Sequence, residues 1–286
     1  MNRWITGARP RTLPAAVVPV AVGAAVAVGE PTDVVWWRVA AALLVSLALQ
    51  VGVNYANDYS DGVRGTDDVR VGPTRLVAGG LASASAVKKA ALLSFGVAAI
   101  AGLAIALSTS LWLLVVGAAA IAAGWFYTGG PRPYGYMGLG EVFVFVFFGL
   151  VATAGTTYAA IESVAALSIV MGSAVGSLAC ALLVINNLRD IPTDREVGKQ
   201  TLAVRLGDQR TRWFYVLLIG TAFVLSAVAA VWQVPVLLGL LALPLAIGPV
   251  RTVLGGAVGP ALIAVLGETG RLQLVWGLLV TVGLVL

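Results

Sequence analysis

The stretch Asn54-Tyr-Ala-Asn-Asp-Tyr-Ser-Asp-Gly-Val-Arg-Gly-Thr-Asp-Asp68 decides how the chain must fold, because it ends the apolar run Trp36–Tyr55. It places carboxylates where a membrane helix would leave the bilayer, and a carboxylate there needs either water or a cation. A second polar stretch, Asn186-Asn-Leu-Arg-Asp-Ile-Pro-Thr-Asp194, follows the apolar run Val164–Ile185 in the same way. Two such stretches predict helices that cross a membrane and share one polar site at their ends.

The composition supports a membrane protein. The chain has 286 residues, of which 59% are hydrophobic and 11% charged, whereas a soluble globular domain is about 25% charged. The net charge of +5 comes from basic residues spread between the apolar runs, so membrane topology explains it better than nucleic-acid binding. The composition therefore predicts an all-α, polytopic membrane protein with the lipid bilayer as its partner.

Residue types that are absent or rare restrict the chemistry. The chain contains no histidine, which excludes His-based catalytic triads, a haem held by His and most zinc or copper sites. The single cysteine, Cys180, lies in an apolar run and can form no disulfide within the chain. Chemistry at the polar stretches therefore depends on oxygen ligands and on arginine or lysine.

Apolar runs long enough to cross a bilayer predict nine transmembrane helices arranged in a bundle around a central cavity. Their ranges are Leu13–Val28, Trp36–Tyr55, Ala90–Leu107, Leu111–Tyr127, Glu141–Ala160, Val164–Ile185, Trp213–Trp232, Val234–Pro249 and Leu272–Leu286. The run Gly259–Leu266 is too short to span and predicts a short helix packed on the loop face.

The basic residues predict the orientation. If nine helices alternate in direction, Arg38 is the only arginine or lysine predicted to lie on its side of the membrane. The positive-inside rule then places the N-terminus in the cytoplasm, in a multi-pass protein of the plasma membrane. The two long connections, Asn57–Lys89 and Asn186–Arg212, are both cytoplasmic in this layout, and each begins at a polar stretch.

The repeated arrangement also predicts a domain organisation. Residues 1–286 are expected to form a single transmembrane domain, with one polar stretch after the second helix and the other after the sixth. This spacing indicates two related four-helix halves, about 1–130 and 131–255, followed by a final helix, and internal repeats around a central site are common in membrane proteins.

The polar stretches have the spacing of a metal site. Asn57 and Asp61 are four residues apart, as are Asp190 and Asp194, so each pair lies on one face of a helical turn. Asn186 lies one turn before the second pair. Carboxylate and amide oxygens suit Mg²⁺, which commonly shares its coordination with phosphate oxygens. Solvated loop charges are the alternative for either stretch alone, but two matching stretches favour a metal site.

Basic side chains beside these acids indicate an anionic ligand. Carboxylates alone would repel a phosphate, whereas carboxylates with Mg²⁺ and neighbouring cations form a diphosphate site. The neighbouring cations are Arg64, Arg75, Arg189, Arg195 and Lys199.

Several motifs together resemble a known family. They are Ala8-Arg-Pro-Arg-Thr-Leu-Pro14, Asn57-Asp-Tyr-Ser-Asp-Gly-Val-Arg-Gly-Thr-Asp67, Tyr127-Thr-Gly-Gly-Pro-Arg-Pro-Tyr134, Gly138-Leu-Gly-Glu-Val-Phe143, Asn187-Leu-Arg-Asp-Ile-Pro-Thr-Asp194 and Gly198-Lys-Gln-Thr-Leu-Ala-Val-Arg-Leu-Gly207. Over nearly its whole length the chain resembles the UbiA superfamily of intramembrane aromatic prenyltransferases. Within that superfamily it is similar to the 1,4-dihydroxy-2-naphthoate polyprenyltransferases of menaquinone synthesis, the MenA type. The broad superfamily has an acid where this chain has Gly65, and MenA-type sequences share the shift to Asp67.

The resemblance implies a mechanism and a role for each motif residue. A polyprenyl diphosphate would ionise at its allylic C–O bond, and an activated carbon of dihydroxynaphthoate would attack with loss of CO₂, giving demethylmenaquinone. Asp61, Asp190, Asp194 and Lys199 are the implied catalytic residues. The implied Mg²⁺ ligands are Asn57, Asp61, Asp190 and Asp194; the implied diphosphate-binding residues are Arg64, Lys199 and Arg132; and the implied supporting residues are Asp58, Asp67, Asn186, Asn187 and Tyr134.

Two alternatives stay open. The acceptor could be another aromatic or phosphorylated molecule, or the chain could be an ion-coupled transporter, although a transporter would place its acids deep within the helices rather than at their ends. Arg9 and Arg11 can likewise be interpreted in two ways. They either set the topology of the first helix or bind the carboxylate of the acceptor.

Overall fold

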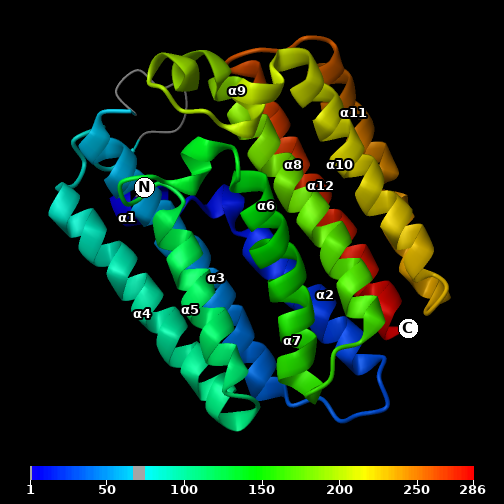
Figure 1. The fold of residues 1–286 in the computed structure, drawn as a ribbon. Coiled ribbons are helices and arrows are strands. Elements are labelled where there is room, and N and C mark those ends of the chain that lie inside the picture. The colour runs from blue at the N-terminus through cyan, green and yellow to red at the C-terminus, as the bar shows by residue number, and fades with distance from the viewer. Residues whose placement is uncertain (1, 67–74) are drawn as a thin grey trace.

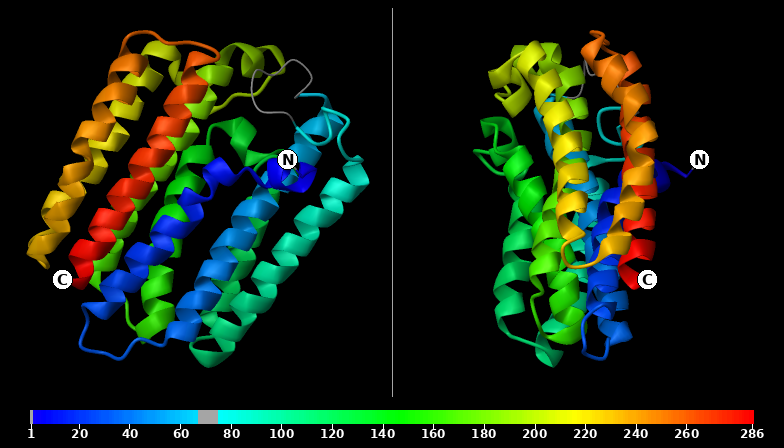
Figure 2. Two further views of the ribbon diagram at one scale, coloured as in Figure 1. Left: turned by 180° about the vertical axis from the view of Figure 1, so that it is seen from behind. Right: turned by 90° about the vertical axis from the view of Figure 1, so that its right-hand side faces the viewer.

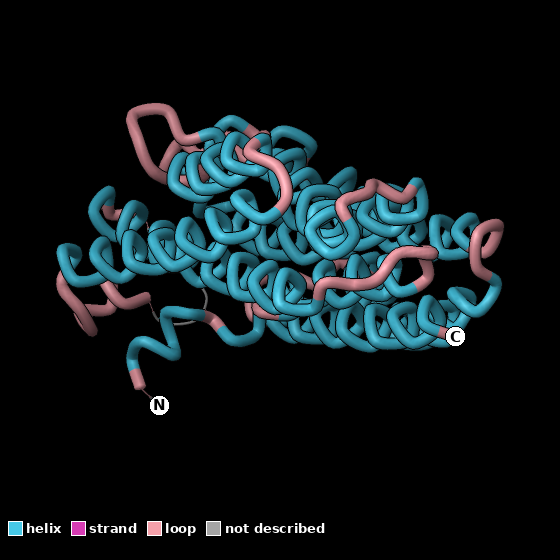
Figure 3. The backbone as a smooth tube through the Cα atoms, turned by 90° about the horizontal axis from the view of Figure 1, so that it is seen from below, coloured by secondary structure: helices cyan, strands magenta, loops and turns pink. Residues whose placement is uncertain are grey.

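The computed structural model describes residues 2–66 and 75–286, and every regular element in these ranges is a helix, as the tube drawing shows (Figure 3). The elements are α1 Arg3–Ala8, η1 Pro10–Thr12, α2 Pro14–Val28, α3 Trp36–Arg64, α4 Ala84–Ser108, α5 Trp112–Phe126, η2 Tyr134–Met137, α6 Gly140–Val144, η3 Phe145–Val151, α7 Ala152–Ile161, α8 Ala166–Glu196, α9 Leu202–Leu206, α10 Asp208–Ala229, η4 Val234–Ala242, α11 Leu243–Leu254 and α12 Ala261–Val285. The all-α, membrane-type architecture expected from the sequence is therefore present.

Each predicted apolar run coincides with a helix or with consecutive helical segments. Within the described ranges, seven helices are long and apolar enough to cross a membrane. Two runs fall short of this test. The first, α2, forms a pair with α1 and η1 that is bent by 51°, and the fourth, α5, has only 15 residues.

The first polar stretch is helical as far as Arg64 and the second is helical throughout, which corrects the prediction that long loops begin at Asn57 and Asn186. Helix α3 continues for 29 residues to Arg64, and α8 continues for 31 residues to Glu196. Gly65 ends α3 with φ +73°, a left-handed conformation that glycine adopts without strain. The helices persist because the polar side chains are buried and find partners inside the protein, while the helical backbone satisfies its own hydrogen bonds.

The prediction of a separate short helix at Gly259–Leu266 is wrong, because α12 runs without a break from Ala261 to Val285. Glu268 and Arg271 interrupt the apolar run in the sequence, but both lie on the exposed side of α12, whereas Leu262 and Leu272 are buried. The charged residues therefore lie on the exposed side of one long helix and do not mark a break in it.

The fifth predicted helix contains a π-helical segment, η3, between α6 and α7. At this segment Gly149 lies so close to α8 that an added Cβ would be 2.6 Å from the carbonyl oxygen of Gly172 and 2.6 Å from the Cα of Gly176. The eighth predicted helix begins as the 3₁₀ helix η4 and becomes α-helical at Leu243, with Pro235 and Pro244 in the first turns of the two parts.

The helices form two packed groups with a cavity region between them. The larger core contains buried residues of α2, α8, α10 and α12, and a smaller cluster lies between α3 and α4. Helices α2 and α12 lie side by side when the molecule is seen from behind (Figure 2). The ends of α3 and α8 that carry the polar stretches lie at the same end of the bundle (Figure 1). The fold thus brings two stretches that are far apart in the sequence to one end of the protein.

Candidate active site

The two polar stretches face one cavity of about 190 Å³. Although charged, Asp61, Asp190 and Asp194 are buried, with exposed fractions of 4%, 6% and 9%. This burial excludes the interpretation that these acids are solvated loop charges. The site residues predicted from the sequence that line the cavity are Asn57, Asp61, Asn186, Asn187, Asp190, Asp194 and Lys199.

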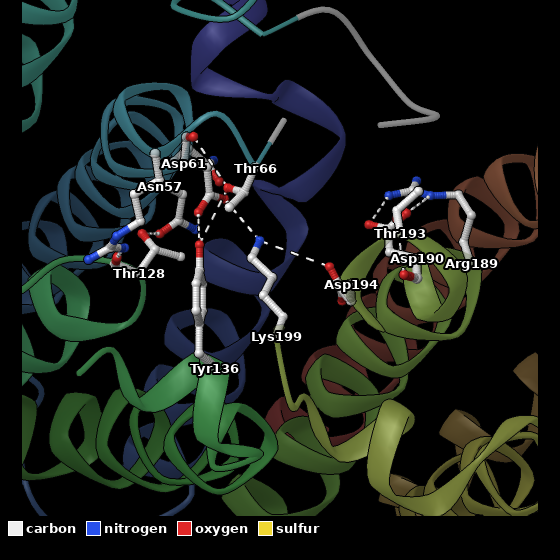
Figure 4. A network of polar contacts seen from close by, with 12 residues as sticks. Asn57, Asp61, Thr66, Thr128, Tyr136, Arg189, Asp190, Thr193, Asp194 and Lys199 are labelled. Carbon is white, nitrogen blue, oxygen red and sulfur yellow. Dashed lines mark hydrogen bonds and ion pairs between the residues drawn. The ribbon is translucent and has the colours of Figure 1, made fainter. Parts of the chain in front are cut away.

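On the α3 side, the polar groups are held by the segment that follows α5. The Asn57 side chain accepts a hydrogen bond from Thr128 Oγ1 at 2.9 Å, and Asp61 Oδ1 accepts one from the Tyr136 hydroxyl at 2.7 Å (Figure 4). Burial, reinforced by the charge of Asp61, raises the pKa of Tyr136. Tyr136 therefore keeps its proton at neutral pH and remains a donor to Asp61.

On the α8 side, Asp190 accepts two hydrogen bonds from Arg189, from Nε and Nη2, each at 2.7 Å. Lys199 connects the two sides, because its ammonium Nζ lies 3.6 Å from Asp61 Oδ2 and 4.0 Å from Asp194 Oδ1 (Figure 4). The same Nζ lies 4.7 Å from the centre of the Tyr136 ring. A cation thus already lies between the acids of the two helices.

Asn187 is held by a buried carboxyl group that the sequence did not assign to the site. Its Nδ2 donates to Glu141 Oε1 at 2.9 Å, and Glu141 is only 5% exposed. Because this bond uses an amide N–H, the carbonyl oxygen of Asn187 remains available to accept another partner. Asn187 lines the cavity, so α6 helps to orient one of its polar groups.

The acids fit a metal ion that is shared with a ligand, rather than a site built from protein alone. Among the described residues, no group of three or more acidic, cysteine or histidine side chains could hold a metal by itself. Mg²⁺ usually takes one or two carboxylates, keeps several waters and completes its coordination with substrate phosphates. The arrangement of Asp61 opposite Asp190 and Asp194 fits this pattern, with oxygen donors on two walls of one cavity.

Two motif residues in α3 hold neighbouring chain segments. Both carboxylate oxygens of Asp58 accept backbone N–H groups, from Leu76 at 2.8 Å and from Val77 at 3.0 Å. The Arg64 guanidinium donates to the carbonyl oxygens of Thr128 and Gly130. Asp58 thus holds the segment at Leu76 and Val77, which precedes α4, and Arg64 holds the segment that contains Thr128.

The remaining predicted residues lie in different places. Arg132 is exposed and does not line the cavity, and Asp67 lies outside the described residues. Tyr134 donates to the carbonyl oxygen of Ala123 at 2.8 Å, and its ring stacks on Phe143 with centroids 3.9 Å apart. Tyr134 lines a second, apolar cavity rather than the polar one.

The apolar cavity, about 390 Å³, is lined by side chains of α3, α4, α5 and the α6–η3–α7 unit. It adjoins the polar cavity, because the two cavities share wall residues. The shared residues are Val53, Tyr127, Val144 and Phe148. A ligand with a polar head and a long apolar tail could therefore occupy both cavities at once.

Sequence reasoning missed part of the polar wall. Gln50 and Asn54 line the same cavity on the same helix as Asn57 and Asp61. The signal was available, because polar residues at 50, 54, 57 and 61 follow the helical repeat within an otherwise apolar run. Thr128 gave no such signal, since only the fold brings it to Asn57.

The chain is similar to characterised proteins over nearly its whole length. Residues 16–255 match the model of the UbiA prenyltransferase family. The chain is 51% identical over 281 residues to a 1,4-dihydroxy-2-naphthoate octaprenyltransferase of Mycobacterium tuberculosis, covering 97% of this chain and 95% of that protein. A protein of the same name from Escherichia coli is 35% identical, covering 99% of this chain and 95% of that protein.

Solved structures share the fold at low sequence identity. A UbiA homologue from Aeropyrum pernix superposes with a TM-score of 0.72 at 15% identity, covering 94% of this chain and 96% of that one. A UbiA homologue from Archaeoglobus fulgidus, described as bound to DMAPP and Mg²⁺, has a TM-score of 0.63 at 17% identity and covers 98% of this chain and 100% of that one. From the family match and the full-length relatives, the chain belongs to the UbiA prenyltransferase family.

Proposed function

We propose that this protein transfers a polyprenyl group from polyprenyl diphosphate to 1,4-dihydroxy-2-naphthoate, with loss of CO₂ and diphosphate, and so forms demethylmenaquinone. The observation that carries the proposal is a single cavity in which acids of α3 and α8 face each other across Lys199 and which adjoins an apolar cavity. Full-length relatives named as 1,4-dihydroxy-2-naphthoate octaprenyltransferases support the choice of acceptor.

The polar cavity suits the diphosphate. Its oxygen donors, Asn57 and Asp61 on α3 with Asp190 and Asp194 on α8, would hold Mg²⁺, and Lys199 is placed to meet diphosphate oxygens directly. The description of one solved relative as bound to DMAPP and Mg²⁺, and of another as bound to Cd²⁺, supports a divalent cation. When bound, Mg²⁺ would supply positive charge to the leaving diphosphate.

The chain's own residues would stabilise the departing diphosphate more than they stabilise the intact ester. As the allylic C–O bond breaks, its electron pair leaves with the diphosphate, and negative charge accumulates beside the Lys199 ammonium. Because Lys199 is held between Asp61 and Asp194, the charge is preorganised and little reorganisation is needed during the reaction. Tyr127 and Tyr136 line the same cavity, where an aromatic ring would stabilise the allylic cation.

The acceptor needs little help from the protein, because its own hydroxyl groups activate the ring. The ring carbon that carries the carboxylate forms the new C–C bond, and the bond to the carboxylate then breaks, returning its electron pair to the ring as CO₂ leaves. The adjoining apolar cavity would take the first isoprene units of the donor. The rest of the tail would extend between the helices into lipid.

The proposal includes the placement of the chain in the membrane. We infer that all nine apolar runs cross the plasma membrane, that the N-terminus and the active site face the cytoplasm, and that the two four-helix halves are related. Two features support this placement. Arg38 lies at the start of α3, at the opposite end of that helix from the acids, and there it is neutralised by Glu162 at 2.7 Å.

The decisive experiment is prenyl transfer by purified protein in lipid nanodiscs, with octaprenyl diphosphate and 1,4-dihydroxy-2-naphthoate. The wild-type protein should form product only with Mg²⁺ present and lose activity when EDTA is added. The variants Asp61→Asn and Asp190→Asn should each be inactive. The matched control is Asp33→Asn, the same chemical change at an exposed position outside both cavities, which should retain wild-type activity.

Two results would refute parts of this proposal. Product formation with 4-hydroxybenzoate or another acceptor, but none with dihydroxynaphthoate, would show that the protein is a prenyltransferase with a different acceptor. Retained Mg²⁺-dependent activity in Asp61→Asn or in Asp190→Asn would remove that residue from the ligand set.

A further inference from the structure

Arginines line the wall of the polar cavity on the side of the N-terminal segment. Arg9 and Arg11 lie just before the first membrane helix, and both line the cavity that also contains Asp61 and Lys199. Arg9 is half-buried, and Arg11 is exposed at the rim of the cavity. Positive charge in the cavity therefore comes from the N-terminal segment as well as from Lys199 and Arg75, which line the same cavity.

A polar network fixes the N-terminal segment against α3. Thr12 Oγ1 accepts hydrogen bonds from Gln50 Nε2 at 2.9 Å and from Asn54 Nδ2 at 3.1 Å. Asn54 Nδ2 also donates to the carbonyl oxygen of Ala8 at 2.9 Å, while Arg9 Nη2 donates to the carbonyl oxygen of Asn54 at 3.3 Å. Gln50 and Asn54 are 7% and 3% exposed. Such buried amides are satisfied only while the segment stays in place.

The backbone at these arginines is also constrained. Arg9 has φ +53°, and only one other non-glycine residue in the described ranges has a positive φ. A non-glycine residue in this conformation costs about 1–3 kcal/mol, and such strain persists where the surroundings enforce it. The backbone of Arg11 lies against α12, where a Cβ added at Gly270 would be 3.7 Å from the Arg11 carbonyl oxygen. Both arginines are thus presented from a fixed turn rather than from a loose terminus.

Arg9 and the Lys199 ammonium contact α3 at different levels. Asn54, which contacts Arg9, precedes Asp61 by seven residues on α3, which is about 10 Å along the helix axis. A diphosphate held at Asp61 and Lys199 would leave Arg9 and Arg11 for a second anion. The acceptor of the proposed reaction carries a carboxylate, and guanidinium groups pair well with carboxylates.

We propose that Arg9 and Arg11 bind the carboxylate of the aromatic acceptor, so that the turn before the first membrane helix selects carboxylated acceptors. This inference rests on the proposed function. The bound carboxylate orients the ring, with the carbon that carries it directed toward the allylic carbon at the acids. Because the carboxylate later leaves as CO₂, the contact serves ground-state binding and should influence KM more than kcat.

The test compares acceptors that differ only in the carboxylate. Steady-state rates are measured in nanodiscs for wild type, Arg11→Gln and Arg9→Gln with 1,4-dihydroxy-2-naphthoate and with 1,4-dihydroxynaphthalene, which lacks the carboxylate. Arg11→Gln should raise KM for the carboxylated acceptor about 10- to 100-fold, the loss expected for a charged hydrogen bond. Rates with the carboxylate-free acceptor and KM for octaprenyl diphosphate should stay within about twofold of wild type, and Arg11→Lys should recover part of the loss.

The matched control is Arg3→Gln. It removes one positive charge from the same N-terminal segment, but Arg3 donates to the carbonyl oxygen of Leu81 and does not line the cavity. Its KM for every substrate should equal that of wild type. Thermal unfolding of each variant shows whether the segment remains folded, which matters most for Arg9→Gln because Arg9 also binds the Asn54 carbonyl.

Three outcomes separate this inference from the proposed function. An equal loss with both acceptors, or a raised KM for the donor, would overturn the carboxylate assignment while leaving the prenyltransferase intact. If wild type fails to prenylate dihydroxynaphthoate, the proposed function falls. The assignment is then decided by calorimetric titration with 1-hydroxy-2-naphthoate and 1-naphthol. It stands only if Arg11→Gln weakens binding of the carboxylated ligand alone.

Discussion

The ammonium of Lys199 lies 3.6 Å from the Asp61 carboxylate, although Asp61 lies in the last turns of α3 and Lys199 follows α8. Both side chains are largely buried, so the attraction between them is screened less than a surface ion pair would be. Because the same ammonium lies 4.0 Å from Asp194, Lys199 connects the two polar stretches. It also places a cation where negative charge would develop on a departing diphosphate.

Lys199→Met should therefore reduce turnover strongly. Loss of a preorganised charge at such a position costs about 10²–10³-fold in kcat, and the loss should appear in kcat/KM for octaprenyl diphosphate. Lys199→Arg keeps the charge and should be less impaired. If Lys199→Met instead changed only KM for the acceptor, the result would contradict a contact between the Lys199 ammonium and the diphosphate.

Arg189→Met should destabilise the fold. It removes the guanidinium that pairs with Asp190 through two hydrogen bonds in a buried environment, and breaking a buried ion pair costs about 3–5 kcal/mol. Thermal unfolding in detergent measures the effect. Arg195→Met, at an exposed position on the same helix, is the control. The double variant Arg189→Met with Asp190→Asn should recover part of the lost stability, because it removes the charge left without its partner.

Asp58→Ala should act on stability rather than on metal binding. Its carboxylate accepts the backbone N–H groups of Leu76 and Val77, and losing such charged hydrogen bonds costs about 1.5–3 kcal/mol each. The melting temperature should fall, while the Mg²⁺ concentration that gives half-maximal activity should stay the same. A large rise in that concentration would make Asp58 a metal ligand and contradict the structural role.

Gly149→Ala should disturb the packing of the π-helical segment on α8. The new methyl group would lie 2.6 Å from backbone atoms of Gly172 and Gly176, and overpacking of this kind costs about 1–3 kcal/mol. Gly220→Ala in α10 is the matched control, because nothing lies within 4 Å of its added Cβ. Helix propensity predicts that the control is neutral or slightly stabilised. Equal melting temperatures for the two variants would show that α8 can move away from η3.

The helical class and the polar pairs that line the cavity could be predicted from local sequence patterns. Continuous apolar runs must become helices in a bilayer, because their backbone groups can pair only within the segment. The spacing of Asn57 with Asp61, and of Asp190 with Asp194, predicted which side chains share a helix face, since that periodicity is a local property. Both pairs line one cavity. The metal role assigned to them stays a prediction.

The partners of these side chains depend on how distant segments pack together. Tyr136 and Thr128 reach Asp61 and Asn57 from a segment about seventy residues away, which no local pattern encodes. The sequence also could not show that Arg132 lies outside the cavity, or that Arg9 lines it. Charge and motif position indicate which chemistry a side chain can perform. The packing of distant helices determines which side chains share a cavity, because contacts between them depend on the whole fold.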